Sequence, residues 1–378
     1  MKTNCSIILL LLIVLMSCRS TKLHQLPLDT QKQIGSEGEL PIDIQQQTQK
    51  RIDLGYHLNT IIGVVDKNGM RFYSYGQMSL TNTAKPDENS FFEIASNTKP
   101  FTTTLLADLE LNGKIKINSP IELYLPVFKQ VLSKSNRKVT LEDLINHTSG
   151  LPRDASNVTI NDSNRYYDYT PEKLNEFLSN YKINSKKEYL YSNLAYVALE
   201  RAIEVKMNES YESLTKKRIL EVLDMNDTYF KVPSKKRGRL VTPFRKGKHV
   251  TELDMGIFPA AGGLKTTAKD MLRFLEAQFG QYPTSLDNAF QITHKERYSN
   301  KEETLGLAWK IMKREESGKK LLFHKGGSNG FVSFIGFNPE DQIGVIVFAS
   351  GNGWFSDLGF KILDPSYPLT LVKKSNQK

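Results

Sequence analysis

Cysteine is almost absent from this chain of 378 residues, which contains only two, Cys5 and Cys18. Both stand near the N-terminus, so the rest of the chain has no thiol at all. Disulfide frameworks and zinc sites built on cysteine both need several thiols at short spacings. The sequence therefore excludes a disulfide-stapled domain and a thiol metal site, and we expect neither a metal nor a cofactor.

A concentrated run of one charge is also lacking. The net charge is +10, from 51 Lys and Arg against 41 Asp and Glu. The basic residues occur in short groups such as Lys235, Lys236 and Arg237, without a long basic arm interleaved with aromatic residues. We therefore expect a solvated basic surface and no nucleic-acid partner. Attraction to anionic envelope polymers or lipid is the alternative interpretation of the charge.

Long apolar runs are missing except at the very start, where Ile7–Met16 is uninterrupted. This run is too short to span a bilayer as a mature helix. Lys2 precedes it and Ser17 and Cys18 follow it, an order that is typical of a cleavable signal. The segment resembles a bacterial lipoprotein signal, and the alternative is an ordinary secretory signal with a chance cysteine.

The lipoprotein resemblance implies that residues 1–17 are removed and that lipid is attached to Cys18. Residues 18–49 are polar and rich in Gln, so we expect them to form a tether between the lipid and a folded domain. The predicted localisation is the cell envelope, with the protein anchored to a membrane through its lipid.

Strand signals stand at both ends of the remaining chain. Thr60–Asp66 and Met70–Tyr75 are β-branched and aromatic runs joined through an Asn-Gly pair, a strong hairpin signal. Phe331–Phe337 and Ile343–Ala349 form a second predicted hairpin. An antiparallel sheet closed by both ends of the chain is therefore expected.

Helix-start signals fill the chain between these hairpins. Thr140 opens a capping box, Pro171 stands at a first helical position, and Thr267 precedes another amphipathic run. We predict an α+β fold for residues 50–378, with a largely antiparallel sheet flanked by helices and an all-helical insertion at about 116–250.

The stretch Phe91–Gly113 places a serine and a lysine at the start of an apolar helix. Ser96 and Lys99 are three residues apart, so a helix that begins near Ser96 brings both side chains onto one face. The amine can then take the hydroxyl proton, and the N–H groups of the helix start favour an oxyanion. Other serines with this spacing lie in charged or loop-like surroundings: Ser135, Ser179, Ser213, Ser317 and Ser375.

A second candidate group is Tyr191 with Asn193, immediately before another apolar helix. A phenol can shuttle a proton, and an amide can orient a substrate carbonyl. The alternative is structural, because Asn is a good helix cap. Tyr298 and Asn300 share the spacing but run into a charged loop, so the first pair is the better candidate.

A third candidate group begins at His324 and continues through Gly326 and Gly327 to the predicted strand at Phe331. Glycine permits close backbone approach, so Gly327 can offer its N–H to an oxyanion while His324 lines the substrate site. The alternative is a simple turn with a surface histidine.

Ser328 is a rival nucleophile because Gly326–Gly330 matches the G-x-S-x-G elbow of α/β-hydrolases. That elbow leads from a strand into a helix, whereas Phe331–Ile335 has a strand pattern. The elbow also needs a later histidine, and no histidine follows His324. The sequence thus disfavours Ser328.

Three motifs stand in order along the chain: Ser96-x-x-Lys99, Tyr191-x-Asn193 and His324-x-Gly326. Together they resemble the penicillin-recognising serine hydrolases, in the branch of class C β-lactamases, low-molecular-weight D,D-peptidases and related esterases. The resemblance covers almost all of residues 50–350. Leu144–Leu151 and Pro259–Leu264 look like linking motifs of that family.

The resemblance implies a β-lactamase/transpeptidase-like fold with the site in a cleft between the sheet and the helical region. It implies that Ser96 is the acylated nucleophile, Lys99 its base partner and Tyr191 the proton shuttle. Asn193 is then a substrate contact. The backbone N–H groups of Ser96 and Gly327 form the oxyanion hole.

The third motif departs from the family pattern, because His324, Lys325 and Gly326 stand where the best-known members have Lys-Thr-Gly. An imidazole with an unperturbed pKa of about 6.5 is only partly protonated and anchors a carboxylate less well than an ammonium. Strand alternation points Lys325 away from the face of His324. We expect poor turnover of common penicillins and cephalosporins and better turnover of uncharged esters or peptide-like substrates.

The leading hypothesis is an envelope-anchored serine hydrolase that forms an acyl-enzyme on Ser96. Its substrate is a small molecule or peptide with an amide, lactam or ester bond. The alternative is a catalytically silent lipoprotein that binds cell-wall peptide in the cleft, which the altered motif at His324 supports.

Overall fold

The computed structural model describes residues 38–133, 137–159, 166–183, 186–353 and 355–372. The predicted signal peptide of residues 1–17, the predicted lipidation site Cys18 and the tether up to residue 37 lie outside these ranges. Residues 40–378 form one compact unit. No helix within the described ranges combines the length and the apolar character needed to cross a bilayer.

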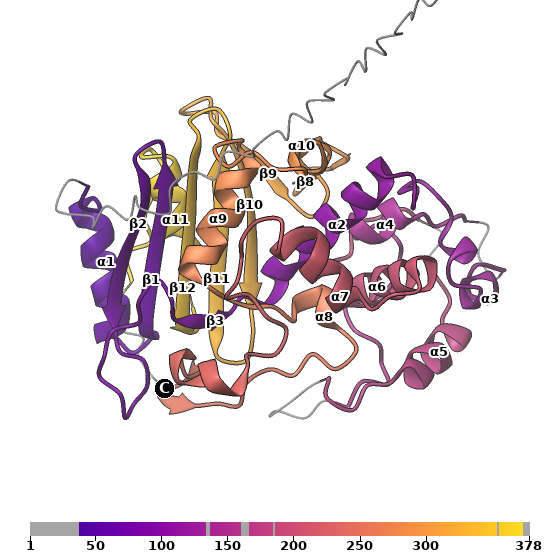
Figure 1. Cartoon of the computed structure of the whole chain (residues 1–378), viewed down its shortest axis with the longest axis horizontal. Coiled ribbons are helices and arrows are strands. Elements are labelled where there is room, and N and C mark those ends of the chain that lie inside the picture. Colours follow the sequence, from indigo (N-terminus) through magenta and orange to yellow (C-terminus); the bar gives the residue numbers. More distant parts are fainter. Residues whose placement is uncertain (1–37, 134–136, 160–165, 184–185, 354, 373–378) are drawn as a thin grey trace, which may run out of the picture. The chain divides into compact units, whose positions relative to one another are not determined.

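An antiparallel sheet of eight strands organises this unit, in the order β2-β1-β12-β11-β10-β9-β8-β7 (Figure 1). The four central strands are β1 (His57–Asp66), β12 (Ile343–Gly351), β11 (Phe331–Asn338) and β10 (Lys320–Gly327). The outer strands are β2 (Gly69–Gly76), β9 (Lys310–Lys313), β8 (Thr304–Leu305) and β7 (Tyr298–Ser299). Both predicted hairpins are confirmed, with Asp66 opposite Gly69 and Asn338 opposite Ile343.

Helices cover both faces of the sheet. On one face α9 (Ala268–Gln278) packs on β1 and β12, and its buried residues join the larger core cluster. On the other face α11 (Ser356–Leu363) packs on β11 and β12 beside α1 (Ile42–Asp53). The strands β1 and β12 are buried along almost their whole length because they are covered on both sides.

The remaining helices lie mostly to the right of α9 in Figure 1. They are α3 (Val127–Ser133), α4 (Leu141–Ile145), α5 (Pro171–Asn180), α6 (Asn193–Met207), α7 (Tyr211–Thr215), α8 (Pro259–Gly262) and α10 (Asp287–His294). Single helical turns connect them: η1 (Ala95–Thr98), η2 (Ile121–Leu123), η3 (Lys216–Leu220) and η4 (Ser234–Arg239). Four of these helices, α6, α7, α8 and α10, pack on the buried helix α2 (Lys99–Leu111).

Three predicted helix starts are confirmed by their caps. The Thr140 side chain and Asp143 form a reciprocal capping box at α4, and α5 begins at Pro171. Thr267 caps α9 by accepting the N–H of Asp270. These polar side chains satisfy N–H groups that the first helical turn leaves without partners.

Two features differ from the sequence prediction. The segment expected to be all-helical also contains a short hairpin of β4 (Phe244–Arg245) and β5 (Lys248–His249). A further small pair joins β3 (Phe91–Glu93) to β6 (Lys265–Thr267).

The tether boundary at residue 49 was wrong, because α1 is already part of the domain. Its buried face carries Ile44, Thr48 and Arg51, of which only the first is apolar. Thr48 donates its hydroxyl to the carbonyl of Ile44, and Arg51 pairs with Asp357 of α11 at 2.7 Å. Polar residues that are satisfied by such partners hide a buried helix face from a hydrophobicity pattern.

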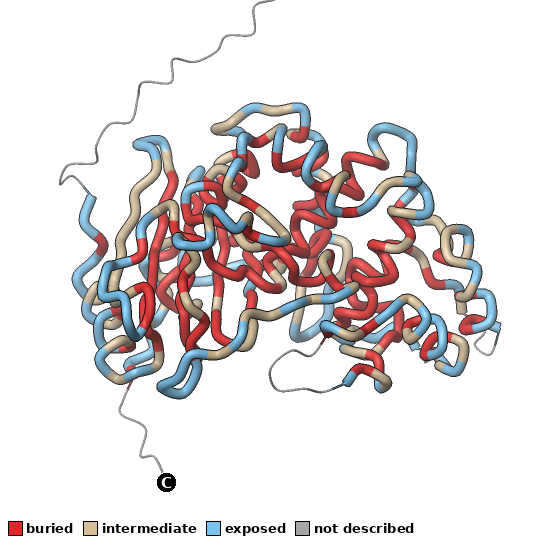
Figure 2. The backbone as a smooth tube through the Cα atoms, turned by 60° about the horizontal axis from the view of Figure 1, so that its bottom comes forward, coloured by how far each residue is buried: buried red, intermediate tan, exposed pale blue. Residues whose placement is uncertain are grey.

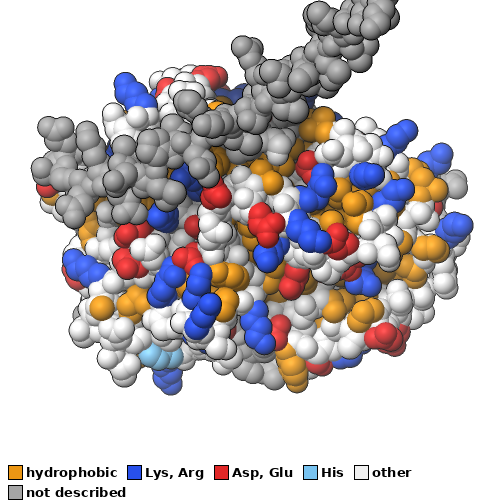
Figure 3. All heavy atoms as spheres, viewed as in Figure 1, with side chains coloured by type: hydrophobic (Ala, Val, Ile, Leu, Met, Phe, Trp, Pro, Cys, Tyr) orange, Lys and Arg blue, Asp and Glu red, His pale blue; other side chains and the backbone are white. Residues whose placement is uncertain are grey.

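Buried residues run through the central strands and on into the helices around α2, whereas exposed residues lie mainly on the connecting loops (Figure 2). On the face seen in Figure 3, Lys and Arg side chains are interspersed with Asp and Glu. Part of the basic segment near η4 is paired, since Lys236 and Arg239 both contact Asp227.

Candidate functional site

A tight turn between β3 and α2 presents Ser96. The preceding residue, Ala95, has a backbone φ of 46°. Residues other than glycine rarely adopt this left-handed conformation, which is found at functional turns. Within Phe91–Pro100 every residue is buried except Ser96, which is partly exposed. The chain turns through η1 and enters α2 at Lys99, so the predicted helix begins three residues later than expected.

The structure brings Ser96, Lys99 and Tyr191 together. The hydroxyl of Tyr191 donates to Ser96 Oγ at 2.8 Å, and Lys99 Nζ lies 3.2 Å from the same oxygen. Tyr191 comes from the segment just before α6 and lies 95 residues after Ser96 in the chain. A hydroxyl oxygen between an amine and a phenol has both a group to remove its proton and a group to pass one on.

Lys99 is fully buried, and three oxygen atoms surround its Nζ. Its Nζ donates to the Ala261 carbonyl at 2.6 Å and to Asn193 Oδ1 at 3.0 Å, and both of these oxygens can only accept. A neutral amine has two N–H donors and one lone pair. When the amine is neutral and both N–H groups bind these two oxygens, its lone pair is directed to the third partner, the hydroxyl of Ser96.

Burial lowers the pKa of Lys99, although the neighbouring Tyr191 acts in the opposite direction. Burial opposes ionisation of Tyr191, but the positive charge of Lys99 and the hydrogen bonds of the phenol outweigh it and lower the pKa of Tyr191. Both shifts bring the two groups closer to the pH range in which a proton can be exchanged between them.

Asn193 holds the lysine in place. Its Oδ1 accepts from Lys99, and its Nδ2 donates to Asp154 Oδ1 at 3.1 Å. The hydroxyl of Tyr166 donates to the same carboxylate oxygen at 2.8 Å. Because a carboxylate fixes the amide orientation, the oxygen of Asn193 must face Lys99. The contact to substrate that the resemblance implies for Asn193 stays a prediction.

His147 fixes the segment that carries Tyr191. Its carbonyl accepts the N–H of Leu190 at 2.8 Å, and its Nδ1 accepts the N–H of Ser192 at 3.1 Å, so the two contacts lie on either side of Tyr191. The imidazole ring also lies 4.4 Å from the Tyr191 ring. Burial lowers the pKa of His147 well below its usual value, which keeps Nδ1 available as an acceptor.

His324 lies on β10 beside the nucleophile segment, but it is not the partly protonated group that the sequence analysis expected. It is buried, and burial lowers its pKa well below the usual value, so the imidazole is neutral. The nearby charges of Lys99 and Lys310 lower this pKa further.

A chain of hydrogen bonds fixes the tautomer of His324. The Ile94 carbonyl can only accept, so Ser333 Oγ donates to it at 2.8 Å and in turn accepts from Asn97 Nδ2 at 2.9 Å. Asn97 Oδ1 therefore faces His324 Nδ1 at 3.2 Å and accepts a hydrogen bond from its N–H. His324 Nε2 is left without a proton, so this ring atom can accept a hydrogen bond but cannot act as a cation.

Gly326 explains how β10 approaches the nucleophile. A Cβ atom at this position would lie 2.1 Å from the Ile94 carbonyl oxygen and 2.4 Å from Ser333 Oγ, so only glycine fits. Gly327 follows at the exposed end of the strand. β9 pairs with β10 only through Lys320–Phe323, so the same edge of residues 324–327 has no strand partner in the described part of the chain.

Ser328 does not occupy a nucleophile elbow. It follows β10 and its N–H donates to the carbonyl of Phe331, the first residue of β11. The chain thus turns from strand to strand, and the helix that an elbow requires is absent at this turn. The strand that the sequence predicts after Ser328 is confirmed.

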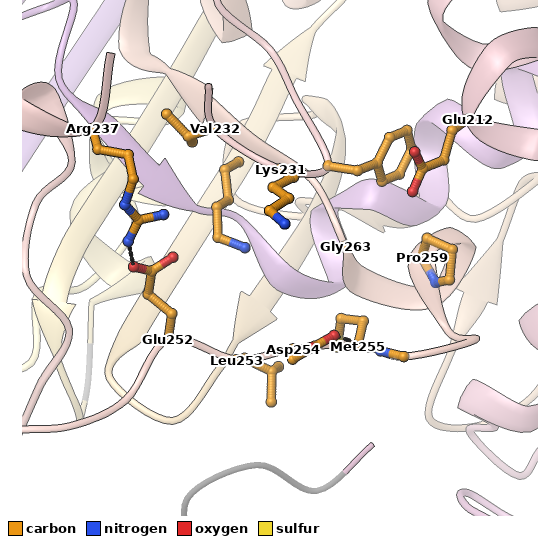
Figure 4. Close-up of a pocket in the computed structure, with 13 residues that line it drawn as sticks. Glu212, Lys231, Val232, Arg237, Glu252, Leu253, Asp254, Met255, Pro259 and Gly263 are labelled. Atoms are coloured by element: carbon orange, nitrogen blue, oxygen red, sulfur yellow. Dashed lines mark hydrogen bonds and ion pairs between the residues drawn. The ribbon is translucent and has the colours of Figure 1, made fainter. Parts of the chain in front are cut away.

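A cavity of about 430 Å³ lies next to α8 (Figure 4). It is lined by residues of both charges, among them Lys231, Arg237 and Glu252, and Figure 4 shows Arg237 facing Glu252. Neither Ser96 nor Lys99 lines it. Because its charges are mixed and partly paired, we assign no role to this cavity. In the described ranges no group of His, Cys, Asp and Glu side chains is arranged to hold a metal.

Sequence reasoning missed several residues of the site. His147 was recognised only as part of a linking motif, and Asp154 and Asn97 carried no signal of their own. Their roles depend on contacts across 39 to 236 residues of sequence separation, from Asp154 to Asn193 and from Asn97 to Ser333. Ser192, not Asn193, caps α6, so the structural alternative for Asn193 as a helix cap is wrong.

The two hydrogen bonds by which His147 holds the chain on either side of Tyr191, here called the clamp, make it a testable positioning residue. His147 has a φ of 58°, so His147→Gly keeps the backbone conformation while it removes the ring. We expect kcat to fall by about tenfold to a hundredfold, because the phenol is then poorly placed. His147→Asn tolerates the same φ and restores an acceptor for Ser192, so it should recover part of kcat. Rates and thermal unfolding are measured together, and a Gly variant with undiminished kcat would disprove the clamp.

Comparisons with known proteins agree with this geometry. The family model described as Beta-lactamase matches residues 54–361. The D-alanyl-D-alanine-carboxypeptidase/endopeptidase AmpH of Escherichia coli is 27% identical over 299 residues, which cover 75% of this chain and 77% of AmpH. Protein flp of Staphylococcus aureus is 27% identical over 322 residues, 82% of this chain and 64% of that longer protein.

Solved structures show the same fold. A class C β-lactamase superposes with a TM-score of 0.76 at 21% identity and covers 86% of this chain and 96% of its own. The β-lactamase/D-alanine carboxypeptidase of Pseudomonas syringae superposes with a TM-score of 0.72 at 22% identity, covering 86% and 98%. The fold is therefore that of a class C β-lactamase, as predicted. With the family model matched over most of its folded part, this chain belongs to the β-lactamase family of penicillin-recognising serine hydrolases.

Proposed function

We propose that this chain hydrolyses amide, lactam or ester bonds through an acyl-enzyme on Ser96. The observation that carries the proposal is the placement of one hydroxyl oxygen within hydrogen-bonding distance of both Lys99 Nζ and the Tyr191 phenol. A silent binding protein would have no need to bury an unpaired lysine beside a serine, because the desolvation of such an amine is costly.

The chemistry can be followed proton by proton. Neutral Lys99 takes the proton of Ser96 while Oγ bonds to the substrate carbonyl carbon, and the carbonyl oxygen becomes an oxyanion. The N–H groups of Ser96 and Gly327 are the proposed donors to this oxyanion. The proton then passes through Tyr191 to the leaving amine or alcohol as its bond to carbon breaks. In the second half, water attacks the acyl carbon and gives up a proton to the same residues. The bond to Ser96 Oγ breaks, Oγ regains a proton, and the carboxylic acid leaves.

The substrate class follows from the chemistry and from the relatives together. AmpH is named a D-alanyl-D-alanine-carboxypeptidase/endopeptidase, and the Pseudomonas syringae protein is named both a β-lactamase and a D-alanine carboxypeptidase. We propose peptide-like amides and β-lactams as the first substrates to test, with simple esters as reporters of acyl transfer.

Labelling with a fluorescent fluorophosphonate or penicillin tests the nucleophile. We expect mass spectrometry to place the label on Ser96 and Ser96→Ala to abolish it. Ser328→Ala is the matched control, since Ser328 directly follows β10, whereas Lys99 and Tyr191 both contact the hydroxyl of Ser96. Label that survives in Ser96→Ala would refute the assignment, and a wild type that binds penicillin without acylation would favour the silent binding protein.

A lowered pKa of Lys99 predicts the pH dependence of kcat/KM. The base must be neutral, so the rate should rise with pH through the pKa of Lys99 and level off below the usual lysine range. Lys99→Arg keeps the charge but cannot lose its proton, so it should be nearly inactive at every pH. Substantial activity in that variant would mean that Lys99 is only a positive anchor.

We also propose that the mature protein is an envelope lipoprotein, on the support of the signal-like sequence before Cys18. The wild type should partition into detergent, and Cys18→Ser should release it into the aqueous phase. Globomycin, which blocks lipoprotein processing, should increase the size of the wild type but leave Cys18→Ser unchanged. A wild type that ignores the inhibitor would rule out lipid attachment.

A further inference from the structure

We infer that Arg153 recognises a carboxylate on the substrate and thereby takes over the role that His324 cannot fill. The inference rests on the proposed acyl transfer at Ser96 and adds a substrate class to it. Arg153 lies in the loop after α4, and its guanidinium stands 5.1 Å from the centre of the Tyr191 ring. It is therefore one aromatic ring away from the nucleophile.

The strand side of the site lacks a suitable cation. His324 is neutral and commits its only N–H to Asn97. Lys310 forms an ion pair with Glu303, so its charge is already compensated. Lys325 is exposed and alternates with buried neighbours on β10, so it points to the opposite side of the strand from His324.

The backbone of Arg153 is fixed to the catalytic segment. Its carbonyl accepts the N–H of Asn193 at 2.8 Å and that of Leu194 at 3.2 Å, which joins it to the start of α6. These contacts set the position of Arg153 relative to Tyr191, which lies two residues before Asn193. The backbone from which the guanidinium extends is thus fixed relative to the Tyr191 phenol.

The side chain, in contrast, is open to a ligand. It is 65% exposed, and its ion pair with Asp154 is loose, since Nε lies 3.8 Å from Oδ2, beyond hydrogen-bonding distance. Asp154 already accepts from Asn193 and Tyr166. In the described part of the chain no hydrogen bond from the guanidinium of Arg153 is observed, so its N–H donors remain available.

The charge of Arg153 also reaches the proton-transfer groups. It contributes to lowering the pKa of both Lys99 and Tyr191, which shows that it lies near the reacting atoms. Arg153 is therefore well placed to meet a charge on a substrate that lies over Ser96.

The chemistry of a guanidinium identifies the ligand class. Its planar set of N–H donors matches the two oxygens of a carboxylate, and such paired bonds are stronger than bonds between neutral groups. We infer acyl donors that carry a carboxylate close to the scissile bond, as a peptide with a free C-terminal residue does.

Two peptides that differ in one group test this inference directly. One ends in a free D-alanine carboxylate, and the other ends in the D-alanine carboxamide; a p-nitrophenyl ester reports acyl transfer independently. The quantity of interest is kcat/KM for the carboxylate divided by kcat/KM for the carboxamide. We expect Arg153→Gln to lower this ratio by about tenfold to a hundredfold, with most of the change in KM.

Arg153→Lys keeps the charge but not the planar fork, so it should retain part of the ratio. Lys325→Gln removes the same charge from the neighbouring strand and should leave the ratio unchanged. An unchanged ratio in Arg153→Gln, or a lowered one in Lys325→Gln, overturns the inference while ester hydrolysis that depends on Ser96 still upholds the proposed function. A wild type that turns over none of the three substrates refutes the proposed function, and with it this inference.

Discussion

The site depends on one buried amine that forms no ion pair with a carboxylate in the described part of the chain. Lys99 is enclosed by the Ala261 carbonyl, the Asn193 amide and the Ser96 hydroxyl. A charged ammonium in such surroundings loses its hydration without gaining a counter-ion, so the uncharged form is favoured. Most of the other features of the site serve this constraint. α8 supplies the carbonyl, Asp154 orients the amide, and the turn at Ala95 brings the hydroxyl to the remaining lone pair.

The positive charge near the substrate has a different location from the one the family pattern implies. A histidine stands where a lysine is usual, and its burial together with the bond to Asn97 makes it a neutral acceptor. The helical side of the site meanwhile presents the exposed guanidinium of Arg153, which is only loosely paired with Asp154. A cation that binds the substrate carboxylate can therefore stand on either the strand side or the helical side of the site. The reacting groups keep their positions, because this cation needs only to lie close to the substrate.

Much of this organisation could be predicted from the sequence, and the failures have a common cause. The hairpins, the helix caps and the order of the three motifs depend on neighbouring residues, so their signals are local. The helix α1 was mistaken for a tether because Thr48 and Arg51 are buried through polar contacts with distant partners. The charge of His324 was mistaken for the same reason. Its state is set by Asn97, Ser333 and Ile94, which no local pattern connects with it.

The pairing of β1 with β12 has a consequence for how the molecule is made. These central strands align residues 57–65 with residues 344–351. The sheet thus pairs residues from near the start of the domain's sequence with residues from near its end. Contacts between such distant residues form late, since the intervening chain must first be brought together. During synthesis from the N-terminus, β1 and its hairpin partner must wait with one apolar edge uncovered until the ribosome has nearly finished. The segment Thr60–Val65 is thus the place where a growing chain would be most in need of a chaperone.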